Sequence, residues 1–282
     1  REEIAVPLLM IYKKSITSGK LPDDWKIADV IALYKKGSRS ELGNYRPVSL
    51  TSICCKIMES LLRDHIMQHL LVNNLLSSSQ YGFVKGRSTM LKLLQVLDKW
   101  TEYLETGGQI DAVYTDFEKA FDKVPHKRLL AKLKSCGIPQ GLLNWIEKFL
   151  HNRQQRVKVN GSYSKWGRVT SGIPQGSVLG PLLFLIYIND LPEFCTKDSE
   201  IYLFADDAKI FKYVKTDSDC VKLQANLDKL QDWSDKWLLR LNSKKCKVIS
   251  FGRQINNTYV YKLKDKDQFH ELERVDNITD LG

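Results

Sequence analysis

The sequence predicts an α+β fold, and two observations on its apolar residues support this class. Several long segments place apolar residues three and four positions apart, as helices do, whereas several shorter runs are rich in β-branched and aromatic residues. Most of the short runs are expected to pair as antiparallel strands. Helices mixed with mostly antiparallel strands are typical of α+β folds.

Four segments show the clearest helical periodicity, at about residues 52–72, 88–105, 139–150 and 218–241. Pro139 is well placed at the start of the third helix, where a missing backbone N–H does no harm. In the fourth, the apolar side chains on one face are Cys220, Leu223, Leu227, Leu230, Trp233, Trp237 and Leu241. In the second, those expected to face the core are Met90, Leu94, Leu97, Tyr103 and Leu104.

Strands are predicted where short apolar runs end at turn residues. Residues 110–115 form one such run, and Asp116 follows it directly. Residues 201–204 and 209–214 are expected to form a hairpin with Asp206 and Asp207 at its tip. Residues 155–159 and 167–170 are expected to form a second hairpin across Asn160-Gly161, a pair that favours tight turns.

Composition points to a globular protein with a polyanionic partner. The chain has 282 residues, of which 43% are hydrophobic and 27% charged, so neither a membrane protein nor a disordered chain is expected. Its net charge of +10, from 43 basic and 33 acidic residues, favours binding to phosphates. The longest apolar run, residues 178–188, is too short to span a bilayer. Arg1 as the first residue and the apolar pattern at Gly282 suggest a segment of a longer protein.

The cysteines indicate neither zinc nor disulfides. Six cysteines are scattered along the chain, and no pair has the C-x2-C or C-x4-C spacing of a structural zinc site. They are therefore expected to be reduced thiols, several in the core, of an intracellular protein.

Three acids are candidates for metal ligands. Asp206 and Asp207 follow an apolar strand, where adjacent carboxylates are costly unless something neutralises them. A tight turn that exposes both could hold Mg²⁺, which prefers oxygen ligands. Asp116 could supply a third carboxylate and complete a two-metal site for phosphoryl transfer. The simpler alternatives are an ordinary surface turn for the acid pair and a helix N-cap for Asp116.

Two further motifs could contact a ligand. The stretch 171–181 contains three glycines, which would let the backbone approach a ligand closely, and Gln175 is an unusual choice for a plain loop. Near the N-terminus, Lys35 and Lys36 precede Arg46, whose planar guanidinium suits phosphate oxygens. The alternatives are a loop that only precedes the apolar helix at 182–188, and a solvated basic loop.

The order of these motifs resembles that of the reverse transcriptases of non-LTR (LINE-type) retrotransposons, the jockey-like branch in particular, over about residues 7–282. The markers are Leu21-Pro-Asp-Asp-Trp-Lys26, Asn44-Tyr-Arg-Pro-Val-Ser-Leu50, Gly86-Arg-Ser-Thr89, Asp116-Phe-Glu-Lys-Ala-Phe-Asp122, Gly172-Ile-Pro-Gln-Gly-Ser-Val-Leu-Gly-Pro181 and Phe204-Ala-Asp-Asp207. The resemblance implies a right-hand polymerase fold. Fingers from residues 1–108 would be interleaved with a palm from 109–282, and the thumb would be absent from this segment.

The resemblance also implies catalytic roles. Asp116 and Asp206 would be the main ligands of two Mg²⁺ ions, for which Mn²⁺ could substitute, and Asp207 would support them as the third catalytic acid. Lys245, in a Leu-Asn-x-x-Lys motif, would lie close to the departing pyrophosphate. The segment 269–282 would begin the primer-grip hairpin.

Nucleotide binding is implied for residues elsewhere in the chain. Arg46, with Lys35 and Lys36 nearby, would hold the triphosphate of the incoming nucleotide. Phe121 would be a steric gate whose ring clashes with a ribose 2′-hydroxyl. Gln175 and Gly176 would lie against the incoming nucleotide and the template.

The implied reaction is RNA-directed DNA synthesis in retrotransposon replication. An RNA template, a DNA primer and dNTPs would be the partners, and endonuclease and thumb regions are expected in the full-length polypeptide. The nucleus is the expected location for target-primed synthesis, with the cytoplasm as the alternative. Alternative interpretations are a decayed or co-opted copy acting as an RNA-binding module, an RNA-dependent RNA polymerase, and a group II intron or telomerase relative.

Overall fold

The computed structural model describes residues 2–195, 199–265 and 268–280 as two compact units. Unit 1 combines Arg1–Leu75 with Phe121–Tyr187, and unit 2 combines Leu76–Ala120 with Ile188–Gly282. Each unit is discontinuous in sequence, whereas the predicted boundary between fingers and palm is a single cut after residue 108. That boundary stays a prediction.

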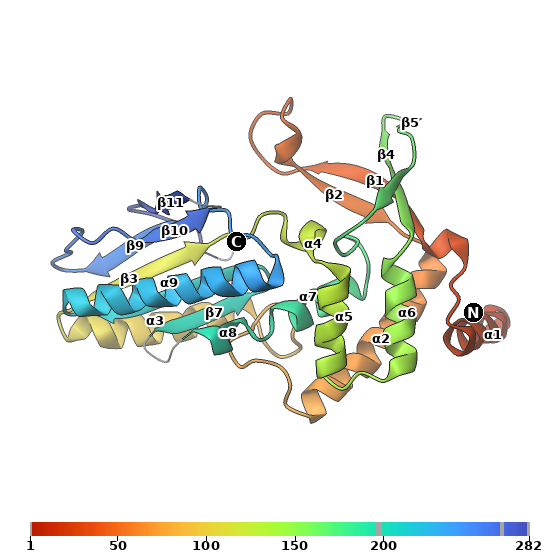
Figure 1. Ribbon diagram of the computed structural model, residues 1–282, viewed down its shortest axis with the longest axis horizontal. Coiled ribbons are helices and arrows are strands. Elements are labelled where there is room, and N and C mark those ends of the chain that lie inside the picture. The colour runs from red at the N-terminus through yellow and green to blue at the C-terminus, as the bar shows by residue number, and fades with distance from the viewer. Residues whose placement is uncertain (1, 196–198, 266–267, 281–282) are drawn as a thin grey trace. The chain divides into compact units, whose positions relative to one another are not determined.

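Unit 1 is built from a mixed sheet and a group of helices (Figure 1). Its strands are β1 (Ile27–Tyr34), β2 (Tyr45–Leu50), β4 (Arg153–Val159), β5 (Ser162–Tyr163) and β6 (Gly167–Val169). Strand β1 pairs antiparallel with β2 and parallel with β4, and β4 also pairs antiparallel with β5 and β6. The longer helices are α1 (Glu2–Ser18), α2 (Ile53–Val72), α5 (His126–Ser135), α6 (Gln140–Leu150) and α7 (Gly180–Ile188), and the short ones are η1 (Asp23–Trp25), η2 (Leu42–Asn44) and α4 (Ala120–Lys123).

The helices of unit 1 form because their apolar residues share one face or because they are apolar throughout. In α2 the side chain of Ser52 caps the helix by accepting from the backbone N–H of Cys55, and the buried face continues through Ile66 and Leu70. Helix α7 is apolar all round and is buried accordingly.

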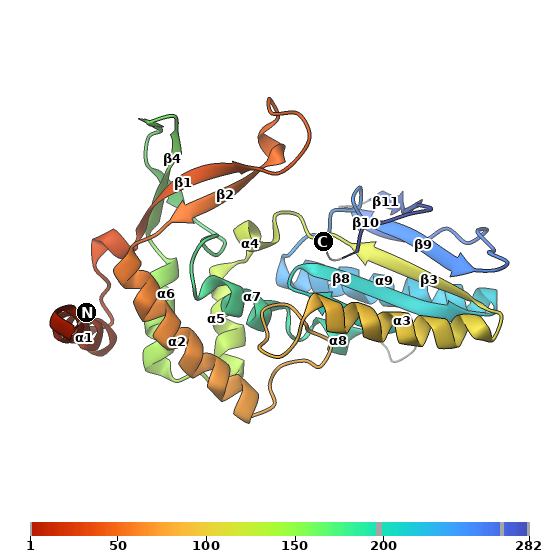
Figure 2. The same ribbon diagram turned by 180° about the vertical axis from the view of Figure 1, so that it is seen from behind.

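Unit 2 is an antiparallel sheet with a helix on each face. The strand order is β12-β9-β3-β8-β7, with only the β12–β9 pair parallel. Helix α9 covers one face in Figure 1, and helix α3 covers the opposite face in Figure 2. The elements are α3 (Thr89–Glu105), β3 (Gln109–Thr115), α8 (Leu191–Phe194), β7 (Glu200–Phe204), β8 (Asp207–Val214), α9 (Asp217–Trp237), β9 (Lys247–Gly252), β10 (Lys262–Asp265), β11 (Gln268–Glu271) and β12 (Glu273–Arg274).

The core beneath α3 shows which face of that helix is buried. Val96 and Trp100 pack on sheet residues that include Ile110 and Phe211. The prediction for this face was wrong in part, because Met90, Leu94 and Leu97 are 65%, 54% and 61% exposed, while Tyr103 and Leu104 do pack against the core. The helix carries apolar residues on two sides, and its large tryptophan decides which side faces the sheet.

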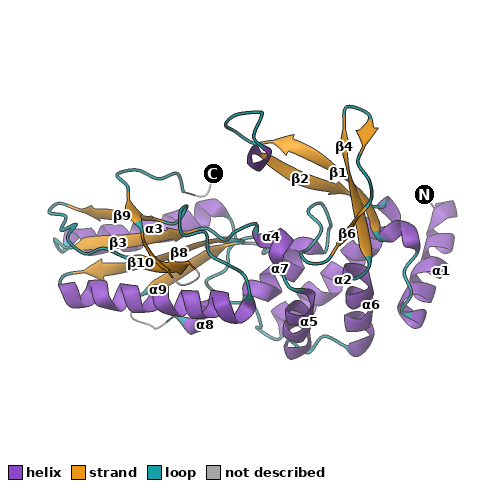
Figure 3. Cartoon of the chain, turned by 45° about the horizontal axis from the view of Figure 1, so that its top comes forward, coloured by secondary structure: helices purple, strands orange, loops and turns teal. Residues whose placement is uncertain are grey.

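Other predicted elements are confirmed with shifted ends. The acid hairpin exists as β7 and β8, and the other predicted helices begin within one residue of the expected position. Helix α9 ends at Trp237, before Leu241, with Leu238 in the left-handed conformation. Asn160 and Gly161 form the expected turn with positive φ of 47° and 82°, and β4 pairs first with the short β5 and then with β6 (Figure 3). None of the helices in the described ranges is sufficiently long and apolar to cross a membrane.

Candidate active site

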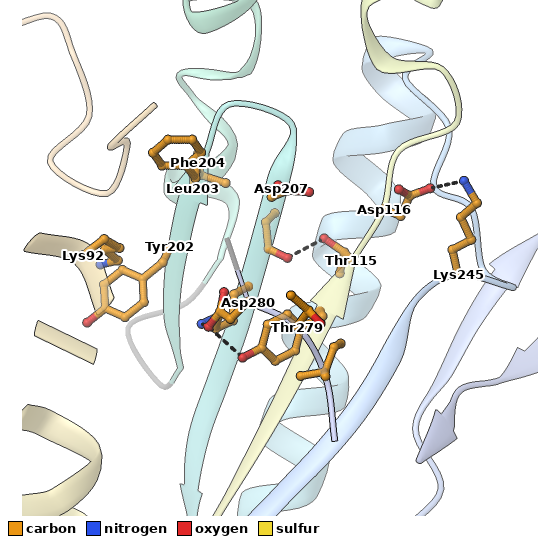
Figure 4. Close-up of a pocket in the computed structure, with 14 residues that line it drawn as sticks. Lys92, Thr115, Asp116, Tyr202, Leu203, Phe204, Asp207, Lys245, Thr279 and Asp280 are labelled. Carbon is orange, nitrogen blue, oxygen red and sulfur yellow. Dashed lines mark hydrogen bonds and ion pairs between the residues drawn. The ribbon is translucent and has the colours of Figure 1, made fainter. Parts of the chain in front are cut away.

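The two predicted acidic positions meet at one end of the sheet in unit 2. Strands β3 and β8 are antiparallel neighbours, and their register sets Thr115 opposite Ala208. The hydroxyl of Thr115 donates to the carbonyl of Ala208 over 2.9 Å and secures this end of the ladder. Asp116 follows Thr115 and Asp207 precedes Ala208, so both carboxylates leave the sheet at the same end (Figure 4).

Asp116 and Asp207 line one cleft of about 250 Å³. Lys245 also lines it, and its ammonium lies 3.7 Å from the carboxylate of Asp116. Lys245 is brought there because the backbone N–H of Asn242 donates to the carbonyl of Asp116 over 2.7 Å. The structure therefore brings three of the predicted site residues together in unit 2.

Asp206 occupies the turn between β7 and β8. Phe204 pairs with Asp207, which leaves Ala205 and Asp206 as a two-residue turn. Ala205 has a φ of 54°, in the left-handed region that residues with a side chain rarely adopt. The turn thus carries local strain beside the acid pair.

The electrostatics of the cleft favour a cation. Asp207 lies at the surface, yet partial desolvation of its carboxyl group, followed by the negative charges of Asp206, Asp116 and Asp280, raises its pKa to about 6. A positive charge nearby would stabilise the ionised form of a carboxyl group crowded by other carboxylates. Oxygen donors in this setting suit a hard divalent cation.

The sequence reasoning missed two residues of the cleft. Asp280 accepts a hydrogen bond from the hydroxyl of Tyr114 over 2.9 Å and forms an ion pair with Lys209 (Figure 4). Lys92 is 2% exposed, and burial lowers the pKa of its ammonium to about 7. Lys92 lies at helical spacing from Val96 and Trp100, and a lysine on this apolar face was the one sequence signal that could have identified it. No local sequence pattern marks Asp280. Residues 281–282 of the predicted primer-grip segment lie outside the described residues.

A metal ion needs several ligands arranged around it, and the structure describes that arrangement only for part of the chain. Within the described residues, no set of three or more His, Cys, Asp or Glu side chains is arranged to hold a metal ion. The ligand set of Asp116, Asp206 and Asp207 therefore stays a prediction, which the type of donor and the raised pKa of Asp207 support.

The predicted triphosphate-binding residues lie on the β1–β2 hairpin of unit 1. Arg46 pairs with Leu33 across the hairpin, and the backbone N–H of Lys35 donates to the carbonyl of Asn44 over 2.9 Å. Lys35, Lys36 and Arg46 are all exposed. The hairpin thus presents three cationic side chains to solvent at one end.

Gln175 and Gly176 lie in a loop that is fastened to β2. The backbone N–H of Ser49 donates to the carbonyl of Gln175 over 2.6 Å, and the Gln175 amide donates to Asp122 over 2.8 Å. Gly176 has a φ of 113°, and a Cβ there would lie 2.5 Å from the carbonyl oxygen of Ser49. Only glycine fits this close approach of two backbones.

Two buried contacts support the same loop and the predicted gate. Glu59 is fully buried and accepts hydrogen bonds from Ser177 and from the next two backbone N–H groups. The half-buried ring of Phe121 stacks on Phe184 with centroids 4.4 Å apart. The sequence reasoning did not identify Glu59, because its partners lie more than 100 positions away along the chain.

The excess of positive charge belongs to unit 1. Its residues include 22 lysines and arginines against 10 aspartates and glutamates, whereas unit 2 has 21 against 23. The unit with the predicted triphosphate-binding residues is therefore strongly basic, and the unit with the predicted metal ligands is nearly balanced. Such a partition favours polyanion binding to unit 1.

This chain is similar in sequence to RNA-directed DNA polymerases of mobile elements. The RNA-directed DNA polymerase from mobile element jockey of Drosophila melanogaster is 31% identical over 255 residues, which are 88% of this chain and 28% of that protein. The probable RNA-directed DNA polymerase from transposon BS of the same fly is 29% identical, over 84% of this chain and 27% of that protein. The chain thus spans little more than a quarter of the length of these relatives.

A solved structure shows the same fold at low sequence identity. Apo telomerase from Candida tropicalis, truncated from its C-terminal domain, superposes with a TM-score of 0.61 at 13% identity, over 90% of this chain and 56% of that one. The model of the family described as reverse transcriptase (RNA-dependent DNA polymerase) matches residues 33–274. The motif order, the mixed α/β fold and this match agree, and the chain belongs to the reverse transcriptase family.

Proposed function

We propose that this chain is the polymerase core of a non-LTR retrotransposon protein and adds dNTPs to a primer 3′-hydroxyl on an RNA template. In this proposal the fold is that of a right-hand polymerase. Residues 1–108 supply fingers interleaved with a palm from 109–282, and the thumb and endonuclease belong to other parts of the polypeptide. Synthesis primed at the target site would take place in the nucleus.

One observation carries the proposal. Asp116 and Asp207 come from neighbouring strands that are far apart in sequence, and they line one cleft together with Lys245. Carboxylates brought together in this way repel each other, and partial burial together with this repulsion raises the pKa of Asp207. A protein has little reason to gather them unless a cation binds there.

The residues of unit 2 would act on the reacting groups. Asp116, Asp206 and Asp207 would hold two divalent cations, Mg²⁺ or Mn²⁺, which when bound supply positive charge for the attacking hydroxyl and the leaving pyrophosphate. The ammonium of Lys245, beside Asp116, would bind the departing pyrophosphate and can donate a proton to it. Catalysis would then consist mainly of positioning and electrostatic stabilisation.

The residues of unit 1 would select and hold the nucleotide. Arg46 would bind phosphate oxygens through its guanidinium, with Lys35 and Lys36 adding charge. Phe121 would exclude the 2′-hydroxyl of a ribonucleotide, since its stacking on Phe184 limits how far the ring can turn. The loop at Gln175 and Gly176 would lie against the nucleotide and the template.

Primer extension on an RNA template tests the proposal. A polypeptide that contains these residues and the thumb is supplied with a DNA primer, dNTPs and Mg²⁺, and extension is expected. Asp206→Asn should abolish extension with an unchanged circular dichroism spectrum, whereas Asp232→Asn, at an exposed acid on α9, should leave it intact. Extension by the Asp206 variant at the wild-type rate would refute the metal-ligand assignment. RNA binding without extension by the wild type would favour the RNA-binding alternative.

A further inference from the structure

Residues 79–81 extend the sheet of unit 2 beyond the edge of β7. Gln80 bridges to Leu203 in parallel fashion. The backbone N–H of Tyr81 donates to the carbonyl of Leu203 over 2.9 Å, and the N–H of Leu203 donates to Ser79 over 3.0 Å. This segment therefore runs beside the strand that leads into the acid turn.

The side chain of Gln80 reaches from this segment to the turn itself. Gln80 is 0% exposed, and its carboxamide oxygen accepts hydrogen bonds from two backbone N–H groups. One is that of Gly82 at 2.7 Å, and the other is that of Ala205 at 3.0 Å. Ala205 is the left-handed residue directly before Asp206, so the amide holds the acid turn at its strained position.

Gly82 packs closely against the same turn, at Ala205. A Cβ at this position would lie 2.4 Å from the backbone nitrogen of Ala205. No side chain fits in that gap without moving the turn. The contact shows that the segment after Gln80 is packed directly against Ala205.

Arg87 fixes the supporting segment in turn. Its guanidinium donates to the carbonyl of Ser77 over 2.8 Å and to the carbonyl of Gln80. The next residue, Ser88, caps α3 by accepting from the N–H of Leu91. The Gly-Arg-Ser-Thr motif thus connects α3 to the segment that carries Gln80.

The amide nitrogen of Gln80 indicates that the residue has more than a structural role. Its Nε2 group is buried and has no hydrogen-bond partner among the described residues. An unpaired buried donor opposes folding and offsets what the accepted hydrogen bonds contribute. Gln80 therefore adds little net stability, although it fixes one backbone group at the acid turn.

We propose that Gln80 is a positioning residue for the polymerase reaction, whose amide oxygen holds Ala205 and so sets the direction of the Asp206 and Asp207 carboxylates. This inference rests on the proposed function. Small displacements of catalytic groups reduce rates strongly, so loss of this hydrogen bond should lower the rate more than the stability. Gln80 itself does not touch substrate in this proposal.

The decisive variant is Gln80→Met, which keeps the length of the side chain and removes the acceptor. We expect kcat for primer extension to fall about tenfold, the equivalent of about 1.4 kcal/mol, with little change in the KM for dNTP. Binding of Mn²⁺ alone, measured by electron paramagnetic resonance, should weaken several-fold. Gln80→Glu retains an acceptor and should recover part of both losses. Gln68→Met, at an exposed position on α2, is the matched control and should change neither.

The result that would overturn the role of Gln80 differs from the result that would overturn the proposed function. A Gln80→Met protein with wild-type kcat and Mn²⁺ affinity would overturn the role of Gln80, whatever its melting temperature. If the variant does not fold, hydrogen exchange in the wild type tests the role of Gln80 instead. The inference requires the amide of Ala205 to be protected. Exchange of this amide at the rate of a free amide would refute the inference. If the wild type binds Mn²⁺ but extends no primer, the proposed function fails, and the Mn²⁺ affinities still test Gln80.

Discussion

Replacing Glu59 by leucine removes the acceptor that fastens the Gln175 loop in unit 1. Glu59 is 0% exposed, and one of its carboxylate oxygens accepts from the Ser177 hydroxyl at 2.5 Å and from the backbone N–H groups of Val178 and Leu179 at 2.8 and 3.0 Å. Leucine has a similar volume and accepts none of these hydrogen bonds. The substitution would leave three donors, two of them fully buried, to find other partners.

The expected loss of stability follows from the number of donors. Each buried donor left unpaired costs roughly 1–3 kcal/mol, and part of that cost is offset by the apolar leucine and by local relaxation. Burial lowers the pKa of the nearby Arg153, which is 2% exposed, and the negative charge of Glu59 partly opposes this effect. The substitution would remove that charge. We expect Glu59→Leu to lower the free energy of unfolding by roughly 3–5 kcal/mol and Glu59→Gln, which keeps an oxygen acceptor, by less.

Urea denaturation followed by circular dichroism measures these differences. The matched control is Glu147→Leu, at an exposed acid on α6, which should change the free energy of unfolding by less than about 0.5 kcal/mol. Hydrogen exchange at Val178 and Leu179 should accelerate in Glu59→Leu. If Glu59→Leu and Glu147→Leu unfold at the same urea concentration, the carboxylate does not hold the loop and the reasoning is wrong.

Three further predictions concern single side chains. Phe121→Val should raise incorporation of ribonucleotides, and unchanged discrimination in a competition assay would exclude Phe121 as the gate. Arg46→Ala should raise the KM for dNTP more than it lowers kcat, and an unaltered dNTP requirement would contradict its role. Burial lowers the folded-state pKa of Lys92 from 10.5 to about 7, so at pH 6 the folded chain must hold a charged ammonium in a buried position. Lys92→Met removes this cost and should stabilise the protein at pH 6. The free energy of unfolding of the wild type should rise between pH 7 and 10.5 toward that of the variant. If urea denaturation gives the two proteins the same dependence of this free energy on pH, the prediction is refuted.

The sequence was sufficient to predict the acid hairpin because its signals are local. Apolar residues on both sides of the acid pair defined two strands, and a tight turn between them was the simplest connection. That Asp116 would stand beside Asp207 did not follow from periodicity, because no local pattern tells which strands are neighbours. The motif order supplied that expectation, and the register of Thr115 with Ala208 explains it physically.

The buried face of α3 shows the limit of periodicity when a helix is apolar on two sides. The positions 90, 94 and 97 have helical spacing, but so have 92, 96, 100 and 103. The sheet takes the second set because Trp100 packs edge-on against Phe211, with ring centroids 5.4 Å apart. Lys92 is buried as a consequence, since it shares that face, and a sequence-based reading places a lysine outside.

Gln80 and Glu59 show why the supporting residues of a site escape sequence analysis. Each is a fully buried acceptor for a backbone N–H group of a predicted site loop, and that group is 125 positions away for Gln80 and 119 for Glu59. A loop with buried backbone N–H groups needs acceptors from elsewhere in the chain, because water does not reach those groups. Sequence motifs therefore identify the residues that are predicted to perform the chemistry. The residues that hold these loops in place are single polar residues within apolar surroundings. Only the fold shows which groups these polar residues bind. If this holds, replacing either acceptor should loosen one loop and leave the exchange rates of the other unit unchanged.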